Sequence, residues 1–308
     1  MPNTTSPKVS IIICSYNRAN YIIGAIDSLF NQTAEKPLYE VLVVDNNSSD
    51  NTKQLCLDYI DTHKETGYNI YYLEEKAQGA SFARNTGAAQ AQSPLLAFMD
   101  DDAVAEPDFV ERIVAFFESN KGDGLGGRII PKYIPAEPKW MSYYVSSLVG
   151  NFDYADHLCP FETGKYPLES NMIVKKEDFY LVGGFNTKLP GVVGKLRIGG
   201  EGKEFFYKLQ AAGKIIYYDP LLCVQHVVEV NKLTREYMYR VASGIGRGER
   251  VRMLEKSKSA FYKKLAEYMI KLGASYILAI KYTLQGTPAK AMPVVHFRID
   301  AIKGLIGK

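Results

Sequence analysis

The stretch Leu95-Leu-Ala-Phe-Met-Asp-Asp-Asp102 places five apolar residues directly before three consecutive aspartates. Such a short apolar run is typical of a strand that is buried on both faces in a parallel sheet. The same form occurs twice earlier, in Val9–Cys14, which runs into a polar segment, and in Tyr39–Val44, which ends at Asp45. A helical pattern follows each run. The sequence therefore predicts an α/β fold with a Rossmann-like, mostly parallel central sheet flanked by helices.

The rest of the chain continues this alternation and then changes character. We expect further strands over residues 70–73, 124–130, 172–175 and 215–218, and helices over residues 22–30, 55–60, 80–91, 110–117 and 205–212. Residues 131–167 are rich in proline and aromatic residues and lack periodicity, so we expect a loop-rich insertion that faces a ligand. From Thr234 onward apolar residues recur at helical spacing, which predicts a C-terminal helical extension.

Basic residues are concentrated at the C-terminal end of the chain. Residues 232–308 hold 16 lysines and arginines against 5 acidic residues, whereas residues 1–231 hold 21 against 29. A basic region of this kind indicates contact with something anionic, either a lipid surface or a nucleic acid. An amphipathic helix around Tyr268–Ile277 can lie in a bilayer interface, or it can pack on the rest of the protein with a solvated charged face. No nucleic-acid recognition motif accompanies the charge, so we expect no nucleic-acid partner.

The sequence shows neither a leader pattern nor a membrane span. The first ten residues lack the charged-then-apolar order of a signal peptide. The longest apolar stretch near the C-terminus, Leu272–Ile280, is about half as long as a span requires. The four cysteines lie far apart, which indicates reduced thiols rather than a disulfide framework or a zinc site. We therefore expect a cytoplasmic protein, with peripheral attachment to the cytoplasmic face of a membrane as one use of the basic tail.

Polar residues follow three of the predicted strands. Ser15–Arg18 follow the first strand, Asp45–Asn47 the second and Asp100–Asp102 the fourth. Ligands bind at the carboxyl ends of the strands in open α/β sheets, and carboxylates gathered at one edge repel one another unless a cation is bound. Oxygen ligands in an Asp-x-Asp spacing favour Mg²⁺ or Mn²⁺ shared with substrate phosphates. Taken alone, the triplet is equally compatible with a solvated turn that caps a helix opening at Glu106 and Pro107.

Eight motifs occur in an order and spacing that resemble one known family. They are Cys14–Arg18, Val43–Thr52, Gly79–Gly87, Phe98–Asp102, Glu169–Met172, Val182–Phe185, Gly199–Phe205 and His226. Together they resemble family 2 of the glycosyltransferases, which have the GT-A fold, through about residue 230. The resemblance implies a catalytic region over residues 1–230, with a nucleotide-sugar half over about 1–130 and an acceptor half over about 131–230. The basic, amphipathic helical tail then covers residues 231–308.

The resemblance also implies roles for individual residues. The donor nucleotide would be held by Ser15, Tyr16, Arg18, Asp45, Asn47, Arg84 and Asp100. The metal, Mn²⁺ or Mg²⁺, would be held by Asp100, Asp102 and His226, while Asn171 and Trp140 would face the acceptor. Three of these residues also have simpler interpretations. Arg84 can merely pair with a neighbouring carboxylate. Asp45 can start an Asx turn into the polar residues that follow it, and His226 can be a partly buried histidine that makes one hydrogen bond.

The chemistry of the family needs residues of these types. The sugar leaves its nucleoside diphosphate through an oxocarbenium-like state, and a divalent ion together with Arg84 neutralises the charge that develops on the diphosphate. A carboxylate on the opposite face takes the proton of the acceptor hydroxyl, and one attack from that face inverts the anomeric centre. In the family pattern Gly-Glu-Asp-x-(Asp/Glu) the aspartate is this base, but Gly202 stands at its position. Glu201 and Glu204 are the candidates for the base, with Glu201 slightly favoured because its flanking glycine leaves the loop free to adjust.

The resemblance thus implies an inverting glycosyltransferase that uses a nucleoside-diphosphate sugar, with a UDP-sugar expected. The acceptor would be a saccharide or a lipid-linked saccharide in surface-polysaccharide synthesis. A dinucleotide-dependent oxidoreductase would need Gly-x-Gly-x-x-Gly after the first strand, where Ser15–Arg18 stand instead. A phosphohydrolase with an aspartyl nucleophile could use Asp100 and Asp102 but leaves the first hundred residues unexplained. A nucleotide-sugar-binding protein on the same fold, degenerate at Gly202, is the more serious alternative.

Overall fold

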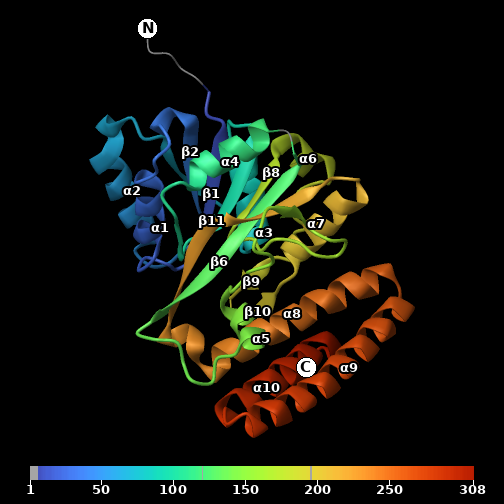
Figure 1. The fold of residues 1–308 in the computed structure, drawn as a ribbon. Coiled ribbons are helices and arrows are strands. Elements are labelled where there is room, and N and C mark those ends of the chain that lie inside the picture. Colours follow the sequence, from blue (N-terminus) through green and yellow to red (C-terminus); the bar gives the residue numbers. More distant parts are fainter. Residues whose placement is uncertain (1–5, 120, 195) are drawn as a thin grey trace. The chain divides into compact units, whose positions relative to one another are not determined.

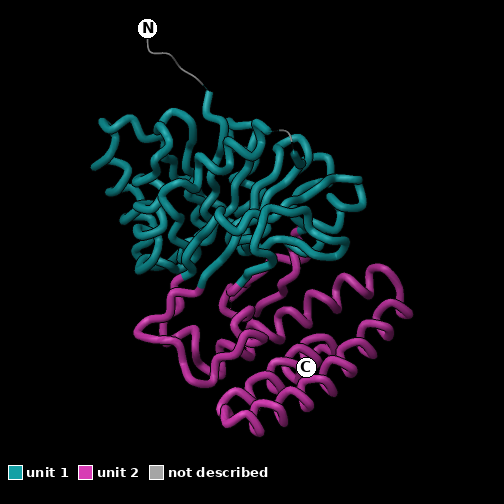
Figure 2. The backbone as a smooth tube through the Cα atoms, in the orientation of Figure 1, with its two compact units in different colours: residues 1–130, 152–186, 202–226 teal, residues 131–151, 187–201, 227–308 magenta. Residues whose placement is uncertain are grey.

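A computed structural model describes residues 6–119, 121–194 and 196–308. The chain forms two compact units (Figure 2). Unit 1 is drawn from residues 1–130, 152–186 and 202–226, and unit 2 from residues 131–151, 187–201 and 227–308. The chain therefore passes several times from one unit to the other.

A mixed sheet forms the centre of unit 1 (Figure 1). Its strands lie in the order β3 (Ile70–Glu74), β2 (Tyr39–Asp45), β1 (Val9–Ser15), β4 (Leu95–Asp100), β8 (Met172–Lys175), β6 (Gly124–Ile134), β11 (Ile216–Glu229) and β5 (Ala103–Ala105). Strands β1 to β4 pair in parallel, whereas β8 is antiparallel to β4 and β6, and β5 is antiparallel to β11. The short strand β7 (Cys159–Pro160) pairs with β11 outside this order. The predicted α/β class with a mostly parallel sheet is confirmed.

Both faces of this sheet are covered by helices. Alternate residues of β1 point to opposite faces, so Ile11 and Ile13 belong to one core cluster and Ile12 to the other. On the face of Ile11 lie α1 (Ile22–Phe30), α2 (Thr52–His63) and α4 (Phe109–Glu118), and on the face of Ile12 lie α3 (Ala80–Gln90), α6 (Lys176–Leu181) and α7 (Glu201–Ala211). Burial on both faces is the reason that β1 and β2 are almost continuously apolar.

Unit 2 is dominated by three long helices, which lie side by side in Figure 1. They are α8 (Arg235–Lys256), α9 (Lys258–Leu284) and α10 (Ala291–Ile306). The backbones of α8 and α10 approach closely at Gly304, where an added Cβ atom would lie 1.9 Å from the carbonyl oxygen of Ser243. An ion pair of 2.6 Å between the exposed Arg235 and the buried Asp300 also joins these two helices. Shorter elements complete the structure: α5 (Tyr143–Ser146), the antiparallel pair β9 (Gly191–Val193) and β10 (Leu196–Ile198), and single turns at η1 (Lys36–Leu38), η2 (Lys64–Thr66), η3 (Ser147–Val149), η4 (Val230–Leu233) and η5 (Pro288–Lys290).

Two of the differences between the predicted and the observed elements have a simple physical basis. The strand expected over residues 215–218 is observed as β11, which continues to Glu229. It contains Pro220, which lies between the segment that pairs with β7 and the segment that pairs with β5. At such a position the missing N–H of proline costs no hydrogen bond to those two strands. The helical extension divides at Ser257, which is extended and whose hydroxyl accepts a hydrogen bond from the N–H of Ala260 at the start of α9. None of the helices in the described ranges is both long and apolar enough to span a membrane.

Candidate active site

The register of β1 brings two predicted aspartates to one edge of the sheet. Ser15 pairs with Asp45 on β2, and Cys14 pairs with Asp100 on β4. Both aspartates end their strands, so their side chains project beyond the sheet as predicted for a ligand-binding edge. Burial raises the pKa of the Cys14 thiol to about 12, with nearby Arg84 opposing the shift. This thiol therefore stays neutral and is no nucleophile.

Two hydrogen bonds hold the Asp45 carboxylate. Oδ1 accepts from the N–H of Ser48 at 2.9 Å, and Oδ2 accepts from the Tyr72 hydroxyl at 2.7 Å. Burial raises the pKa of Tyr72, and the Asp45 carboxylate raises it further, so the phenol stays a donor. The local turn that the sequence allowed for Asp45 is thus present. The two hydrogen bonds leave each carboxylate oxygen of Asp45 with a lone pair for a further donor.

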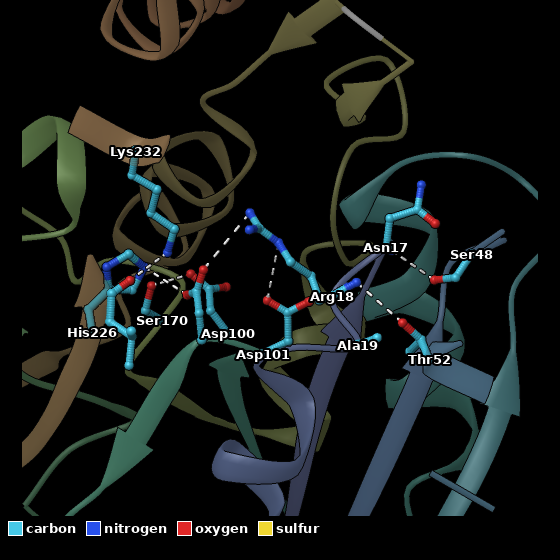
Figure 3. A network of polar contacts seen from close by, with 12 residues as sticks. Asn17, Arg18, Ala19, Ser48, Thr52, Asp100, Asp101, Ser170, His226 and Lys232 are labelled. Carbon is cyan, nitrogen blue, oxygen red and sulfur yellow. Dashed lines mark hydrogen bonds and ion pairs between the residues drawn. The ribbon is translucent and has the colours of Figure 1, made fainter. Parts of the chain in front are cut away.

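The loops that follow β1 and β2 are hydrogen-bonded to one another (Figure 3). The Asn17 N–H donates to Ser48 Oγ at 2.9 Å, and the Arg18 N–H donates to Thr52 Oγ1 at 3.2 Å. Asn17 and Asn47 both have positive φ, at 54° and 66°, a conformation that asparagine tolerates better than most residues. Asn47 is exposed and Tyr16 is half-buried, whereas Ser15 is buried at the end of β1. These contacts hold the predicted nucleotide-binding segments together.

Asp100, Asp102 and His226 form a cluster that could hold a metal ion. One ligand atom from each residue lies within 4.8 Å of the others. The pairing of β5 with β11 places Ala103 opposite His226, so the histidine lies beside Asp102, with Nε2 2.8 Å from Oδ1. Asp100 and His226 are far apart in the sequence but lie close together in the structure (Figure 3).

The donor set of this cluster fits a divalent cation. Two carboxylates and an imidazole suit Mn²⁺ or Mg²⁺ with further positions open to phosphate or water. Burial raises the pKa of Asp101, and the neighbouring charge of Asp102 raises it further. Crowding of negative charge at this edge is therefore unfavourable by itself, and a cation would relieve it.

Two arginines lie beside the acidic triplet. The Arg84 Nη2 atom is 3.7 Å from Asp100 Oδ1, and the Arg18 guanidinium is 3.8 Å from Asp101 and 3.9 Å from Asp102. Arg84 is almost fully buried and comes from α3, whereas Arg18 comes from the loop after β1. Arginine is well suited to bind phosphate oxygens, so both side chains are candidates to contact a phosphate group at this edge.

Two residues that organise this edge were not predicted from the sequence. Ser170 donates a hydrogen bond to Asp100 Oδ2. Asn46 is buried, donates to the carbonyl oxygens of Glu75 and Ala77, and accepts from the N–H of Gly79 at 2.6 Å. Gly79 precedes α3, so Asn46 positions the helix that carries Arg84. The only signal in the sequence was the position of both residues inside motifs.

The two residues predicted to face the acceptor lie in different units. The Asn171 amide donates to the carbonyl oxygens of Arg128 and Leu222, which links β6 to β11. Trp140 belongs to unit 2, where it lines a cavity of about 240 Å³ together with His296 and other residues. Asn171 thus has a structural use, and the acceptor-side role of both residues stays a prediction.

The candidates for the base differ in their surroundings. Glu204 accepts from Asn186 Nδ2 at 2.8 Å and pairs with Lys208 at 3.1 Å. Glu201 is buried and is the first residue of α7. The N–H of the next residue, Gly202, donates to a third carboxylate, that of Glu169, at 2.8 Å.

The comparisons with known proteins agree on one family. The sequence profile described as glycosyl transferase family 2 matches residues 10–177. A glucosyl-dolichyl phosphate glucuronosyltransferase of Haloferax volcanii is 29% identical over 186 residues, which cover 58% of this chain and 56% of that protein. A validoxylamine A glucosyltransferase of Streptomyces hygroscopicus subsp. jinggangensis is 28% identical over 240 residues, or 69% of this chain and 54% of that protein. The chain thus spans about half the length of these curated relatives.

A solved structure shares the fold over nearly the whole chain. It is the mannosyltransferase PcManGT from Pyrobaculum calidifontis in complex with GDP-Man and Mn²⁺. The TM-score is 0.66 at 19% sequence identity, and the match covers 99% of this chain and 89% of the other. Because the family profile covers more than half of the chain, the protein belongs to glycosyl transferase family 2.

Proposed function

We propose that the protein is a glycosyltransferase that moves a sugar from a nucleoside diphosphate to an acceptor hydroxyl. The observation that carries this proposal is the cluster of Asp100, Asp102 and His226, whose ligand atoms lie within 4.8 Å of one another beside Arg84. One buried and one half-buried carboxylate, together with a buried imidazole at the carboxyl edge of the sheet, suit a metal-bound diphosphate. Family membership supports the same reaction class.

In this proposal the donor lies along the edge from β2 to β4. Asp45 receives the ribose or base of the nucleotide, since each of its oxygens has accepting capacity left, and Ser15, Tyr16, Arg18 and Asn47 line the same pocket. Arg84 faces the diphosphate, with Asp100 beside it. Asp100, Asp102 and His226 would hold Mn²⁺ or Mg²⁺, which would neutralise the charge on the leaving diphosphate.

The finer details of the reaction are also part of the proposal. A single displacement, with the acceptor attacking from the face opposite the diphosphate, inverts the anomeric centre. A UDP-sugar is the proposed donor, and a saccharide or lipid-linked saccharide is the proposed acceptor, bound on the side of Trp140 and Asn171. The name of the Haloferax relative includes glucosyl-dolichyl phosphate, which is a lipid-linked sugar, and this supports the proposed class of acceptor. We assign residues 1–230 to catalysis and residues 231–308 to a tail that contacts an anionic membrane surface.

Calorimetry with the Asp102→Asn variant tests the metal assignment. We expect the wild-type protein to bind a nucleotide sugar from a panel of UDP-glucose, UDP-N-acetylglucosamine, UDP-glucuronic acid and GDP-mannose, and to bind it more tightly with Mn²⁺ than with EDTA. The variant keeps the shape of the side chain but loses its charge. The Mn²⁺-dependent gain should fall at least about tenfold, since even groups that only support metal ligands typically contribute this much.

A matched control removes another buried carboxylate. Asp178 on α6 is 2% exposed and pairs with Lys214 at 2.5 Å. Asp178→Asn should lower thermal stability but leave Mn²⁺-dependent binding intact. Equal Mn²⁺-dependent binding in wild type and Asp102→Asn would contradict the metal assignment.

A donor-binding protein without catalysis is the second candidate function. It is favoured by Gly202, which leaves the expected position of the base without a carboxylate. The two candidates differ in one measurement. A transferase releases nucleoside diphosphate from the bound donor, whereas a binding protein retains the intact nucleotide sugar.

A further inference from the structure

A carboxylate occupies the space in front of Gly202. A Cβ atom added to Gly202 would lie 2.2 Å from Oε1 and 2.5 Å from Cδ of Glu169. These distances are shorter than any van der Waals contact. The side chain of Glu169 therefore fills the volume that a side chain at position 202 would take.

The same carboxylate is held by the first turn of α7. The N–H of Gly202 donates to Glu169 Oε1 at 2.8 Å. The N–H groups in the first turn of a helix have no partner within the helix, and the helix dipole favours negative charge there. Glu169 thus has a fixed position, because one of its oxygens is bound to the backbone of an 11-residue helix.

Glu169 is also tied to the donor side of the candidate active site. The next residue, Ser170, donates a hydrogen bond to Asp100 Oδ2, and Asn171 is fixed by two backbone carbonyl oxygens. Consecutive Cα atoms are about 3.8 Å apart. The backbone of Glu169 therefore lies next to a residue in contact with an aspartate of the metal cluster, and the segment that carries it is rigidly held.

One of the other carboxylates of this region, that of Glu204, already contacts two side chains. The two oxygens of Glu204 are separately engaged, one by Asn186 Nδ2 and the other by Lys208 Nζ. Glu201 is the remaining alternative for the base, and the Glu201→Gln variant tests it.

We propose that Glu169 is the catalytic base that accepts the proton of the acceptor hydroxyl. The inference rests on the proposed transferase function. As the acceptor oxygen forms its bond to the anomeric carbon, its proton passes to the Glu169 carboxylate. The bond between the anomeric carbon and the diphosphate oxygen breaks, and its electron pair leaves with the diphosphate. Glu169 is then a neutral carboxylic acid, which returns the proton to solvent after the product leaves.

The contact between Glu169 and Gly202 also predicts how substitutions at these two positions affect each other. A side chain at position 202 would force the Glu169 carboxylate, the far end of a flexible side chain, to move away from the Gly202 N–H. Gly202→Asp alone should impair the enzyme, because its side chain would displace the Glu169 carboxylate from the position it holds at the Gly202 N–H. The exchange of both residues, Glu169→Gly with Gly202→Asp, should restore a single carboxylate to the shared volume.

Turnover of the donor tests the proposal with the full-length chain. The donor is whichever nucleotide sugar of the panel binds to the protein in the presence of Mn²⁺. Water or a simple sugar serves as the acceptor, and the readout is release of nucleoside diphosphate. Glu169→Gln should lower the turnover rate by about 10²- to 10⁴-fold, the usual contribution of a general base, with the dissociation constant of the donor unchanged. Glu162→Gln removes an exposed glutamate of the same unit and serves as the matched control.

The variants separate this inference from the function on which it rests. Among Glu169→Gln, Glu201→Gln and Glu204→Gln, the first should be the most impaired, and the exchanged double variant should be at least about tenfold faster than Glu169→Gly alone. Wild-type turnover in Glu169→Gln, or a larger loss in Glu201→Gln, would overturn the assignment of the base while leaving the transferase function intact. A wild-type protein that neither binds nor turns over any donor would overturn both.

Discussion

Asp100 shows how one residue connects the parts of the candidate site. It ends β4, pairs through the backbone with Cys14 of β1, accepts a hydrogen bond from Ser170 and lies 3.7 Å from Arg84. The sequence predicted its place at the end of a strand, because the apolar run before it is typical of a strand buried in a parallel sheet. It could not predict Ser170, since that contact joins residues 70 positions apart and depends on the position of β8 beside β4.

Asn46 carries a prediction at the scale of a single residue. It is 3% exposed, and its side chain makes hydrogen bonds with the loop before α3. Asn46→Ala should lower the free energy of unfolding by about 2–4 kcal/mol, because several buried groups lose their partner. It should also weaken donor binding, because α3 carries Arg84. Denaturant unfolding and calorimetry measure the two effects.

Two variants make the Asn46 test specific. Asn46→Asp keeps an oxygen that can accept from Gly79 but sets a buried carboxylate oxygen against the carbonyl oxygens of Glu75 and Ala77, so it should destabilise at least as much as Asn46→Ala. Asn51→Ala removes an exposed asparagine whose side chain makes no capping hydrogen bond, and should change stability by less than about 0.5 kcal/mol. If Asn46→Ala matched Asn51→Ala in stability and in donor affinity, the positioning role of Asn46 would be wrong.

Elements were predictable where a single pattern fixes them. Strands β1, β2 and β4 followed from apolar runs, and α1 from its spacing, because burial on both faces of a sheet leaves little freedom in composition. The edge strand β5 spans three residues and was not predicted, although it is the element that places His226 beside Asp102. Its pairing with β11 is a long-range contact, and a periodicity argument does not detect such contacts in three residues.

Helix α9 presents an apolar stripe on its exposed side. Ile270, Ile277 and Leu284 expose 74%, 71% and 83% of their surface, and they recur at seven-residue steps. The further exposed apolar residues of this helix are Tyr262, Met269, Tyr276 and Ile280. Exposed Lys263 and Lys281 lie on the same helix, and residues 232–308 carry 16 basic against 5 acidic residues. An apolar stripe beside cations matches a bilayer surface with anionic headgroups.

Vesicle flotation tests this surface. We expect the protein to float with vesicles of phosphatidylcholine and phosphatidylglycerol, and less with phosphatidylcholine alone. The triple variant Ile270→Ser, Ile277→Ser and Leu284→Ser should abolish flotation, whereas Met292→Ser, an exposed apolar residue on α10, should not. Wild-type protein that stays with the soluble fraction would contradict the membrane proposal. A dimer in solution that the triple variant dissociates would assign the stripe to a second copy of the chain instead.

At the scale of the whole molecule, the α/β class, the order of the motifs and the family could be predicted from the sequence. The boundaries of the two units could not, because the chain enters unit 2 at residues 131–151 and 187–201 before the helical tail begins. These segments lack strong periodicity, and their assignment depends on packing against α8 and α10. The contact of β10 with α8 is an example, since the N–H of Gly199 donates to the carbonyl oxygen of Gly244.

The reaction proposed for the whole chain is the transfer of a sugar from a nucleoside diphosphate to an acceptor hydroxyl. Release of nucleoside diphosphate from UDP-glucose, UDP-N-acetylglucosamine, UDP-glucuronic acid or GDP-mannose, measured with Mn²⁺ on wild type and on the Asp102→Asn variant, tests it most directly. We predict continuous release from at least one donor by the wild-type protein, and loss of that release with EDTA and in the variant. A donor that binds with Mn²⁺ but is recovered intact after prolonged incubation, with and without saccharide acceptors, would contradict the assignment as a transferase.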